Sequence, residues 1–267
     1  MKRSVYRSFK KGGLLSMMAC AALPVVSAHA LEEHKIVDLT HVLDESTIAW
    51  PTTRPFHREQ TAWGVTSAGY WYASGDVVTS EHAGTHIDAP IHFAQGQTSV
   101  DDIALDRLIG PAVVVDVRGA CTQQSDYRLT VEDLRSWELH YGRIPDGAIV
   151  IMYTGWSRFW PDVKKYLGSA TPLDATTLHF PGFSLEAAEF LVRERRVDGI
   201  GIDTASIDHG QSREFTVHQA INGAGKYGLE NIAYLDRLPA SGATLIALPM
   251  KIKGGSGGPV RIVAILP

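Results

Sequence analysis

Three histidines and one aspartate within eleven positions are the residues of this sequence best suited to chemistry. They are His82, His86, Asp88 and His92. Imidazole and carboxylate groups suit zinc, manganese or iron(II) when three or four of them converge on one point. We therefore predict a metal site in this segment, with at most three of the four side chains acting as ligands.

The spacing of these residues favours an extended segment over a helix. All four occupy even positions, and alternate side chains of a strand point to the same face. Gly84 leaves room on that face, and Pro90 disfavours a helix. A straight strand of this length would span roughly 33 Å, so the chain must bend near Gly84 or Pro90 for its ends to reach one ion.

Two later segments also carry polar side chains. His218 and Glu230 are twelve residues apart, and the glycine-rich stretch 222–225 between them would let both return to a common point. The segment 203–208, Asp-Thr-Ala-Ser-Ile-Asp, follows a predicted strand. Strand ends often present ligands in α/β folds, although a capped turn explains the segment equally well.

The first 30 residues predict an export signal. A basic start, an apolar stretch over about 12–26 and the Ala28-His29-Ala30 sequence are typical of a cleaved leader, so the mature protein would begin at Leu31. No apolar run is long enough to span a bilayer. We therefore expect a protein that is exported to the periplasm or secreted.

Charge and cysteine content narrow the function further. The leader contains five basic and no acidic residues, so its removal changes the formal net charge from −4 to −9. This acidic balance disfavours nucleic-acid binding. Cleavage would remove Cys20 and leave Cys121 alone, which excludes an intramolecular disulfide and disfavours thiolate ligation, although Cys20 also leaves lipidation as an alternative.

Short β-branched runs alternate with helical patterns along residues 31–267. Strands are predicted at 36–39, 112–117, 148–153, 199–203 and 243–248. Helices are predicted from Thr130 to His140, with Asp133 in a capping-box position, and from Ser184 to about Arg195. The pattern predicts one α/β domain with a β-rich core and a few flanking helices, because the helices are too few for an eightfold barrel.

Taken together, the run from His82 to His92, the later His218 and Glu230, and the strand end Gly201-Ile202-Asp203-Thr204 resemble the cyclase family of metal-dependent hydrolases. Its members include kynurenine formamidase and isatin hydrolase. The Gly84–Pro90 core carries most of this similarity. The resemblance implies a swivelling β/β/α-type fold, a dimer or larger homo-oligomer, and hydrolysis of an amide in a small aromatic or cyclic substrate.

The resemblance also implies roles for individual residues. His82, His86 and Asp88 would bind a first divalent ion, Mn²⁺ or Zn²⁺, and Asp88, His218 and Glu230 would bind a second. His92 would carry a proton between the metal-activated water and the leaving nitrogen. Formamidases often have two adjacent histidines where this chain has His218-Gln219, which leaves one or two ions open and makes Gln219 a candidate ligand or substrate contact.

The substrate is less well defined by the sequence. Trp63, Trp71 and Tyr72, together with Tyr70, precede the metal run and either stack on a flat substrate or belong to the core. Hydrolytic opening of the isatin ring to give isatinate is the leading expectation, because an exported enzyme would rarely meet N-formylkynurenine, a cytoplasmic metabolite. An arylformamidase is the alternative, and a periplasmic protein that binds a ligand through its metal is the alternative of another class.

Overall fold

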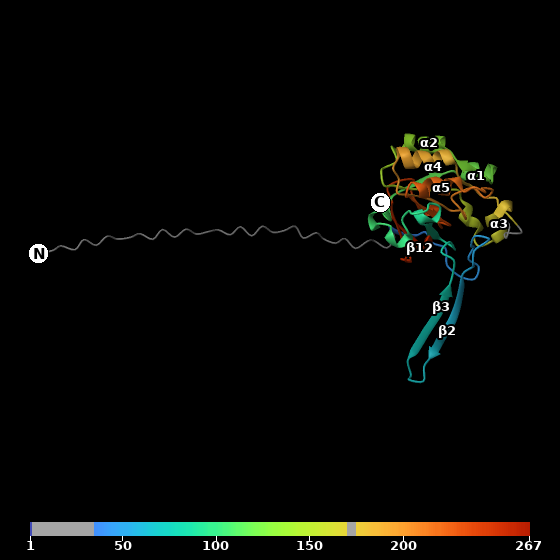
Figure 1. Ribbon diagram of the computed structural model, residues 1–267, viewed down its shortest axis with the longest axis vertical. Helices are drawn as coiled ribbons and strands as arrows, with labels where there is room; N and C mark the ends of the chain where they lie inside the picture. The colour runs from blue at the N-terminus through green and yellow to red at the C-terminus, as the bar shows by residue number, and fades with distance from the viewer. Residues whose placement is uncertain (2–34, 170–174) are drawn as a thin grey trace. The chain divides into compact units, whose positions relative to one another are not determined.

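The structure is a computed structural model that describes residues 1, 35–169 and 175–267, and the residues described from 35 onward form one compact unit (Figure 1). The predicted export signal lies outside the described residues. No helix in the described ranges is long and apolar enough to cross a membrane.

An eight-stranded sheet that closes on itself forms the centre of this unit. Its strand order is β1-β12-β11-β5-β7-β9-β10-β4, and β12 also pairs with β4, which closes the sheet into a barrel. The neighbours β5, β7, β9 and β10 are parallel, and the remaining pairs are antiparallel. The strands are β1 (Ile36–Asp38), β4 (His86–Asp88), β5 (Ile109–Asp116), β7 (Ile149–Tyr153), β9 (Gly199–Ile202), β10 (Tyr227–Glu230), β11 (Thr244–Pro249) and β12 (Gly257–Ile265).

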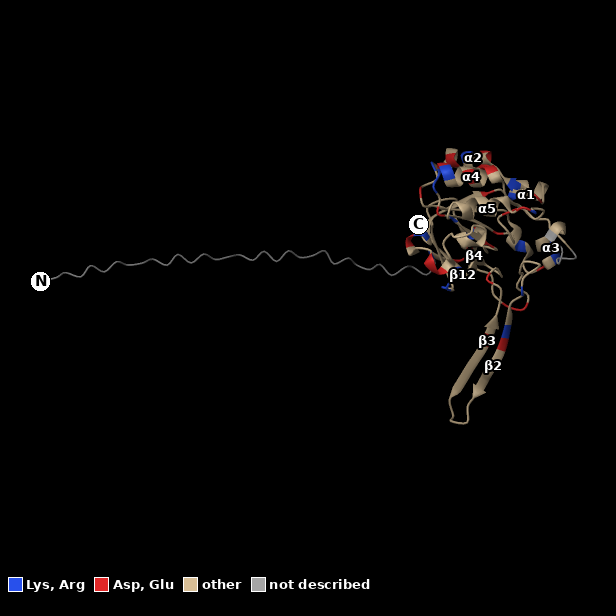
Figure 2. Ribbon diagram, in the orientation of Figure 1, with Lys and Arg blue, Asp and Glu red and all other residues tan. Residues whose placement is uncertain are grey.

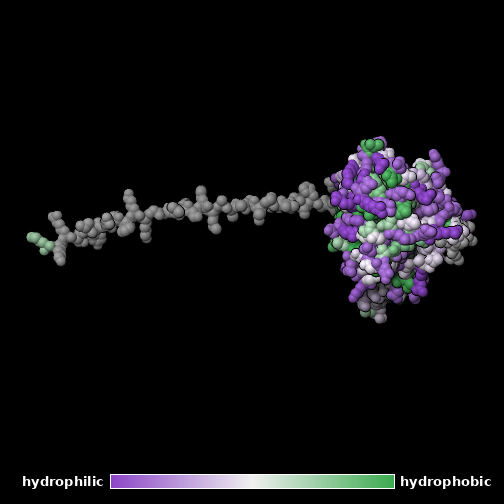
Figure 3. Space-filling model, turned by 45° about the horizontal axis from the view of Figure 1, so that its top comes forward, coloured by the Kyte–Doolittle hydropathy of each residue, from purple (hydrophilic) through white to green (hydrophobic). Residues whose placement is uncertain are grey.

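Helices cover one part of the outside of this barrel (Figure 1). They are α1 (Arg118–Gln123), α2 (Val131–Tyr141), α3 (Val163–Leu167), α4 (Leu185–Glu194) and α5 (Thr216–Gly223). Alternate residues of the parallel strands point to opposite faces, so Val114 and Ile151 fill the barrel while Val113 and Val150 pack against the helices. The face shown in Figure 3 is mostly hydrophilic, with hydrophobic side chains in small groups.

Two further pairs of strands lie outside the closed sheet. Strands β6 (Arg128–Leu129) and β8 (Gly182–Phe183) form a short parallel pair. Strands β2 (His57–Val65) and β3 (Trp71–Val78) form an antiparallel hairpin that extends away from the barrel (Figure 1). This hairpin was not predicted from the sequence.

The expected fold class is confirmed, including the positions of the longer elements. All five predicted strands are present within a few residues of the expected bounds. Helix α2 begins after Thr130, whose hydroxyl accepts from the Asp133 amide while the Asp133 carboxylate accepts from the Thr130 amide, so the predicted capping box is present. The Ser184 hydroxyl caps α4 as expected.

An ion pair joins α2 to the end of α4, and its contribution to the free energy of unfolding can be measured. Arg195 donates from Nε to Glu138 Oε1 at 2.6 Å and from Nη2 to Oε2 at 2.8 Å, and this pairing lowers the pKa of Glu138. Because the folded-state pKa is depressed, the stabilisation is present above the unfolded pKa of about 4.3 and is lost as the pH falls through the folded value. We expect Glu138→Gln to lower the free energy of unfolding by about 1–2 kcal/mol at pH 7.

Thermal melts between pH 3 and 7 check this expectation. The difference between Glu138→Gln and the wild type should shrink as the medium becomes acidic. Glu189→Gln, which breaks the exposed pair with Arg193, is the matched control and should change stability little at any pH. Equal effects of the two substitutions would contradict the assignment.

Candidate metal centre

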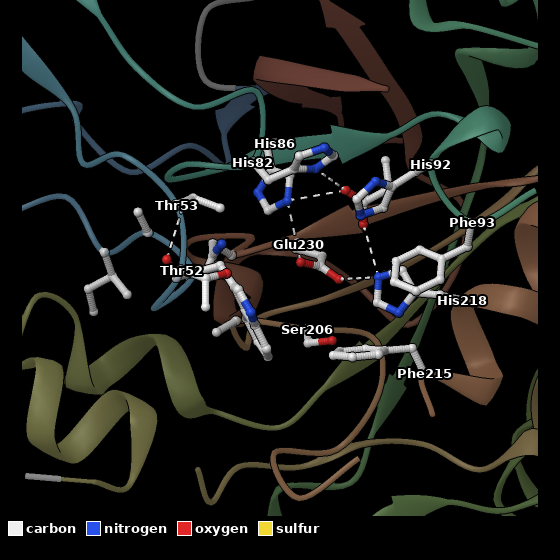
Figure 4. A pocket seen from close by; sticks show the side chains of 16 residues that line it. Thr52, Thr53, His82, His86, His92, Phe93, Ser206, Phe215, His218 and Glu230 are labelled. Carbon is white, nitrogen blue, oxygen red and sulfur yellow. Dashed lines mark hydrogen bonds and ion pairs between the residues drawn. The ribbon is translucent and has the colours of Figure 1, made fainter. Parts of the chain in front are cut away.

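The run from His82 to His92 bends at both places expected from its sequence. Gly84 has a φ of +64°, a backbone conformation that glycine adopts readily. Strand β4 follows, and Pro90 then opens a short 3-10 helix over Pro90–His92. Two bends around a three-residue strand therefore bring side chains at both ends of the run toward one pocket (Figure 4).

One group of potential ligands joins β4 to β10. His86 Nε2 lies 3.3 Å from Asp88 Oδ1 and 3.3 Å from Glu230 Oε2. Ligand atoms of His86, Asp88 and Glu230 all lie within 4.8 Å of one another. His218 adds to this group from α5, with its Nε2 at 3.3 Å from Asp88 Oδ2 and 3.2 Å from Glu230 Oε1. The structure thus brings His218 and Glu230 to a common point.

A second group shares Asp88 with the first. His82 Nδ1 lies 2.6 Å from Asp88 Oδ1, and His92 completes a set of three ligand atoms within 4.8 Å of one another. The imidazole rings of His82 and His92 stack with centroids 4.0 Å apart. The structure thus groups His82 with Asp88 and His92, and His86 with Asp88 and Glu230, while the first-ion set of His82, His86 and Asp88 stays a prediction.

The chemistry and spacing of these residues fit a divalent ion. Ligand atoms that lie 2.0–2.2 Å from a tetrahedral ion are separated by roughly 3.3–3.6 Å, which matches the distances around His86 and His218. Asp88 Oδ2 is buried and accepts no hydrogen bond from the described residues, although His218 Nε2 lies 3.3 Å away. A buried carboxylate oxygen without a donor is costly, and a cation would satisfy it. The described residues thus offer ligands for one or two ions around Asp88.

The histidines of the site are held in fixed orientations. His86 Nδ1 donates to the Gly84 carbonyl at 2.9 Å, and His218 Nδ1 donates to Asp208 Oδ2 at 2.7 Å, so each presents its Nε2 to the carboxylates. Burial alone would lower the pKa of His86, but Asp88 and Glu230 raise it to about 10. An ion must therefore displace protons from these histidines when it binds.

His92 has the opposite electrostatic environment. Burial is the main cause that lowers its pKa, to about 4, and the neighbouring Asp88 only partly offsets it. The imidazole is therefore neutral at pH 7 and has a lone pair that can accept a proton. This supports the proton-carrying role expected from the resemblance, while its place in the second group also makes it a possible ligand.

Asp208 is a residue of the site that the sequence analysis did not select, although the segment 203–208 was noted. Its carboxylate also accepts from the backbone amides of Val217 at 3.2 Å and His218 at 3.1 Å, which fixes the start of α5. Asp203, at the other end of that segment, instead accepts from the amides of Thr154 and Trp156. The segment therefore contributes one orienting carboxylate to the site and one structural carboxylate.

We predict that Asp208→Asn weakens metal binding by about 10–100-fold. The Asp208 carboxylate orients His218 and raises the basicity of its imidazole, and the variant removes the charge that does both. Competition with a chromogenic chelator measures the change. Asp126→Asn is the matched control, since Asp126 pairs with His179 at 2.8 Å, a pair outside the candidate metal groups. Equal affinities of the Asp208 variant and the wild type would show that Asp208 does not support the site.

Aromatic side chains line the pocket above the candidate ligands. The pocket has a volume of about 280 Å³, and its lining includes Trp50, Phe93 and Phe215 as well as the histidines. Phe93 and Phe215 lie with ring centroids 5.4 Å apart, and Trp50 meets Phe215 edge-on at 5.9 Å. These rings were missed because they come from loops and element ends far apart in the sequence, where isolated aromatic residues carry no pattern.

Four proposed substrate contacts do not lie in this pocket. Trp63, Trp71 and Tyr72 are exposed on the β2–β3 hairpin, and the pocket lining does not include them. Gln219 is exposed on α5, and its Nε2 donates to the Glu214 carbonyl. Its side chain follows His218 on the helix and so turns about 100° away from the site. None of these four side chains therefore lines the pocket of its own chain, and their contact with a substrate stays a prediction.

Comparisons with known proteins agree with this geometry. The family model described as "Putative cyclase" matches residues 37–209. Isatin hydrolase of Roseibium aggregatum is 32% identical over 94% of this chain and 99% of that protein, and kynurenine formamidase of Salinibacter ruber is 28% identical over 85% and 96%. A crystal structure of an isatin hydrolase bound to the product analogue thioisatinate superposes with a TM-score of 0.80 at 32% identity, over 87% of this chain and 92% of the other.

The chain therefore belongs to the cyclase family. The relatives named above are hydrolases that act on amide C–N bonds. The family and the enzyme class expected from the sequence are therefore confirmed. The alternative of a protein that only binds a ligand is not supported by these relatives.

Proposed function

We propose that this chain is a metal-dependent amidohydrolase that opens the cyclic amide of a small aromatic substrate, with isatin as the leading candidate and isatinate as the product. The observation that carries the proposal is the pocket itself. It combines two overlapping groups of metal-competent side chains, a neutral histidine and aromatic walls in one cavity. The near full-length similarity to an isatin hydrolase supports the choice of substrate.

His86, Asp88, Glu230 and His218 would hold an ion of zinc or manganese, and His82 with Asp88 offers a second position. A divalent ion bound there lowers the pKa of a water ligand toward about 7 and polarises a carbonyl. The neutral His92 accepts a proton from the attacking water and returns it to the departing nitrogen. Phe93 and Phe215 would orient a flat ring by stacking, which places its carbonyl toward the histidines.

N-formylkynurenine is the second candidate substrate, because kynurenine formamidases are also similar to most of this chain. It is an aromatic formamide and would use the same metal chemistry. We favour isatin because we also propose that residues 1–30 direct export, which would separate the enzyme from this cytoplasmic metabolite.

The direct test uses purified protein that is stripped of metal and reloaded with Mn²⁺ or Zn²⁺. Loss of isatin absorbance that depends on the added ion, with little turnover of N-formylkynurenine, is expected. The reverse preference would identify an arylformamidase. Tight metal binding with no turnover of either compound would refute both substrates while leaving the metal centre in place.

A further inference from the structure

The loop between β11 and β12 carries a serine that contacts the start of the run from His82 to His92. Strands β12 and β4 lie side by side (Figure 2), and Gly257 at the start of β12 pairs with Asp88. Ser256 immediately precedes this pair, and its backbone carbonyl accepts from the Ala89 amide at 2.8 Å. The position of Ser256 relative to β4 is therefore fixed by the backbone.

The Ser256 hydroxyl lies between the side chains of Glu81 and His82. Ser256 Oγ donates to Glu81 Oε2 at 2.6 Å, and the Ser256 amide donates to the same oxygen at 3.0 Å. His82 Nε2 lies 2.9 Å from the same hydroxyl. Glu81 and Ser256 are both half-buried, so these contacts are partly shielded from water. We call Glu81 and Ser256 together the His82 support.

The glycines on either side of Ser256 leave the space that this contact needs. A Cβ atom at position 257 would lie 2.6 Å from His82 Cε1 and 2.4 Å from the Ile87 carbonyl oxygen. A Cβ atom at position 255 would lie 2.9 Å from Glu81 Oε1. Such distances are too short for a side chain, so both positions need glycine for close approach of the backbone. The end of this loop is therefore shaped around Glu81 and His82.

The single hydrogen of the Ser256 hydroxyl decides which nitrogen of His82 carries a proton. A distance of 2.6 Å is typical of a hydroxyl that donates to a carboxylate, so this hydrogen points to Glu81. The hydroxyl oxygen can then only accept from His82, and Nε2 must be the donor. In a neutral imidazole the lone pair is then on Nδ1, which faces Asp88 Oδ1 at 2.6 Å. A lone pair and a carboxylate oxygen at this distance need a cation between them, either a proton or a metal ion.

We infer that Glu81 and Ser256 are positioning residues, which hold His82 so that its Nδ1 is presented to a bound metal ion. This is the reverse of His86 and His218, whose Nδ1 atoms donate to other partners and whose Nε2 atoms face the carboxylates. A partner that accepts from the second ring nitrogen fixes the ring and raises the basicity of the nitrogen that binds the metal. The inference rests on the metal dependence of the proposed function and is independent of the substrate.

A serine nucleophile is the other interpretation of the same contacts. Asp88, His82 and Ser256 follow one another at 2.6 and 2.9 Å, as in the catalytic triad of serine hydrolases. The lining of the pocket includes His82 and Asp88 but not Ser256, so a substrate in the pocket would not meet this hydroxyl. Glu81 also takes the hydrogen that a nucleophilic serine would give to the histidine. These two observations favour the positioning role.

Titration of metal-free protein with Co²⁺, followed by visible absorption, tests the inference without reference to turnover. Ser256→Ala should weaken Co²⁺ binding by about 10–100-fold. It should also change the absorption bands at saturating Co²⁺, because His82 is no longer oriented. Ser99→Ala is the matched control, since Ser99 donates to Asp101 Oδ1 at 2.7 Å outside the candidate metal groups. This control should keep the affinity and the absorption bands of the wild type.

Glu81→Gln provides a second test that keeps the size of the side chain. It should weaken binding of the same ion by a smaller factor than Ser256→Ala, because the amide oxygen still accepts a hydrogen bond but has no charge. The double variant Glu81→Gln/Ser256→Ala should bind Co²⁺ as weakly as Ser256→Ala alone, because both residues act through one contact with His82. His82→Gln identifies which ion is affected if the wild type binds two.

The outcomes separate this inference from the proposed function. Wild-type protein that binds no metal would overturn both. Wild-type binding with the same affinity and absorption bands in Ser256→Ala would overturn the role of the His82 support alone, and loss of turnover in that variant would then identify Ser256 as a nucleophile. Far-UV circular dichroism of each variant must match the wild type. If Ser256→Ala does not fold, unchanged affinity and absorption bands in Glu81→Gln would overturn the inference.

Discussion

Asp88→Asn is expected to abolish metal binding and to reduce turnover by at least about 1,000-fold. This carboxylate lies at 2.6 Å from His82 and at 3.3 Å from both His86 and His218, so it is shared by both groups of potential ligands. The amide keeps the shape of the carboxylate but removes the charge that a divalent ion needs, and the loss of the ion removes its activation of water.

Metal content after dialysis, measured by inductively coupled plasma mass spectrometry, and the rate of isatin hydrolysis check this prediction together. Asp38→Asn is the matched control, because Asp38 pairs with Arg261 in an exposed contact away from the pocket. Full metal occupancy in Asp88→Asn would contradict the proposed centre, whatever the effect on the rate.

His92→Gln is expected to retain its metal and to lower kcat by about 100- to 10,000-fold, the range for loss of a general acid or base. The neutral imidazole at the edge of the ligand groups is the proposed proton carrier, and glutamine cannot accept a proton. The dependence of kcat on pH gives a separate readout. The part of this curve that reflects titration of His92 should be absent in the variant.

His140→Gln, at the exposed end of α2, is the control for general effects of removing a histidine. If His92→Gln instead loses its ion, His92 is a ligand together with His82 and Asp88, as the distances within that group allow. That result would move the proton-carrying role to another residue and leave the ligand set one member larger.

The sequence predicted those parts of the fold in which local pattern and tertiary environment agree. The β-branched run at 148–153 became a fully buried strand, and the capping residues Thr130 and Ser184 start their helices. The hairpin was not predicted because its exposed aromatic residues give no alternating burial pattern. Strand β4 was not predicted as a strand because three residues are too short for any periodicity.

The candidate site could be predicted where its residues lie close together in the sequence. His82, His86, Asp88 and His92 form a recognisable run, whereas Asp208 and Phe215 contribute through long-range packing that spacing does not encode. The aromatic residues before the run illustrate the limit: their type suggested substrate stacking, but the strand register places them on an exposed arm. The type of these residues suggested stacking on a substrate, whereas the path of the chain determines which surface they occupy.

Strand β4 would couple the stability of the fold to metal binding. Its three residues both close the barrel, by pairing with β10 and β12, and supply two of the proposed ligands. An ion bound to His86, Asp88 and Glu230 would therefore hold together neighbouring strands at the seam, and ligand binding adds to folding stability in proportion to the logarithm of free ligand. The concentration of free metal would then set the stability of the folded enzyme as well as its rate.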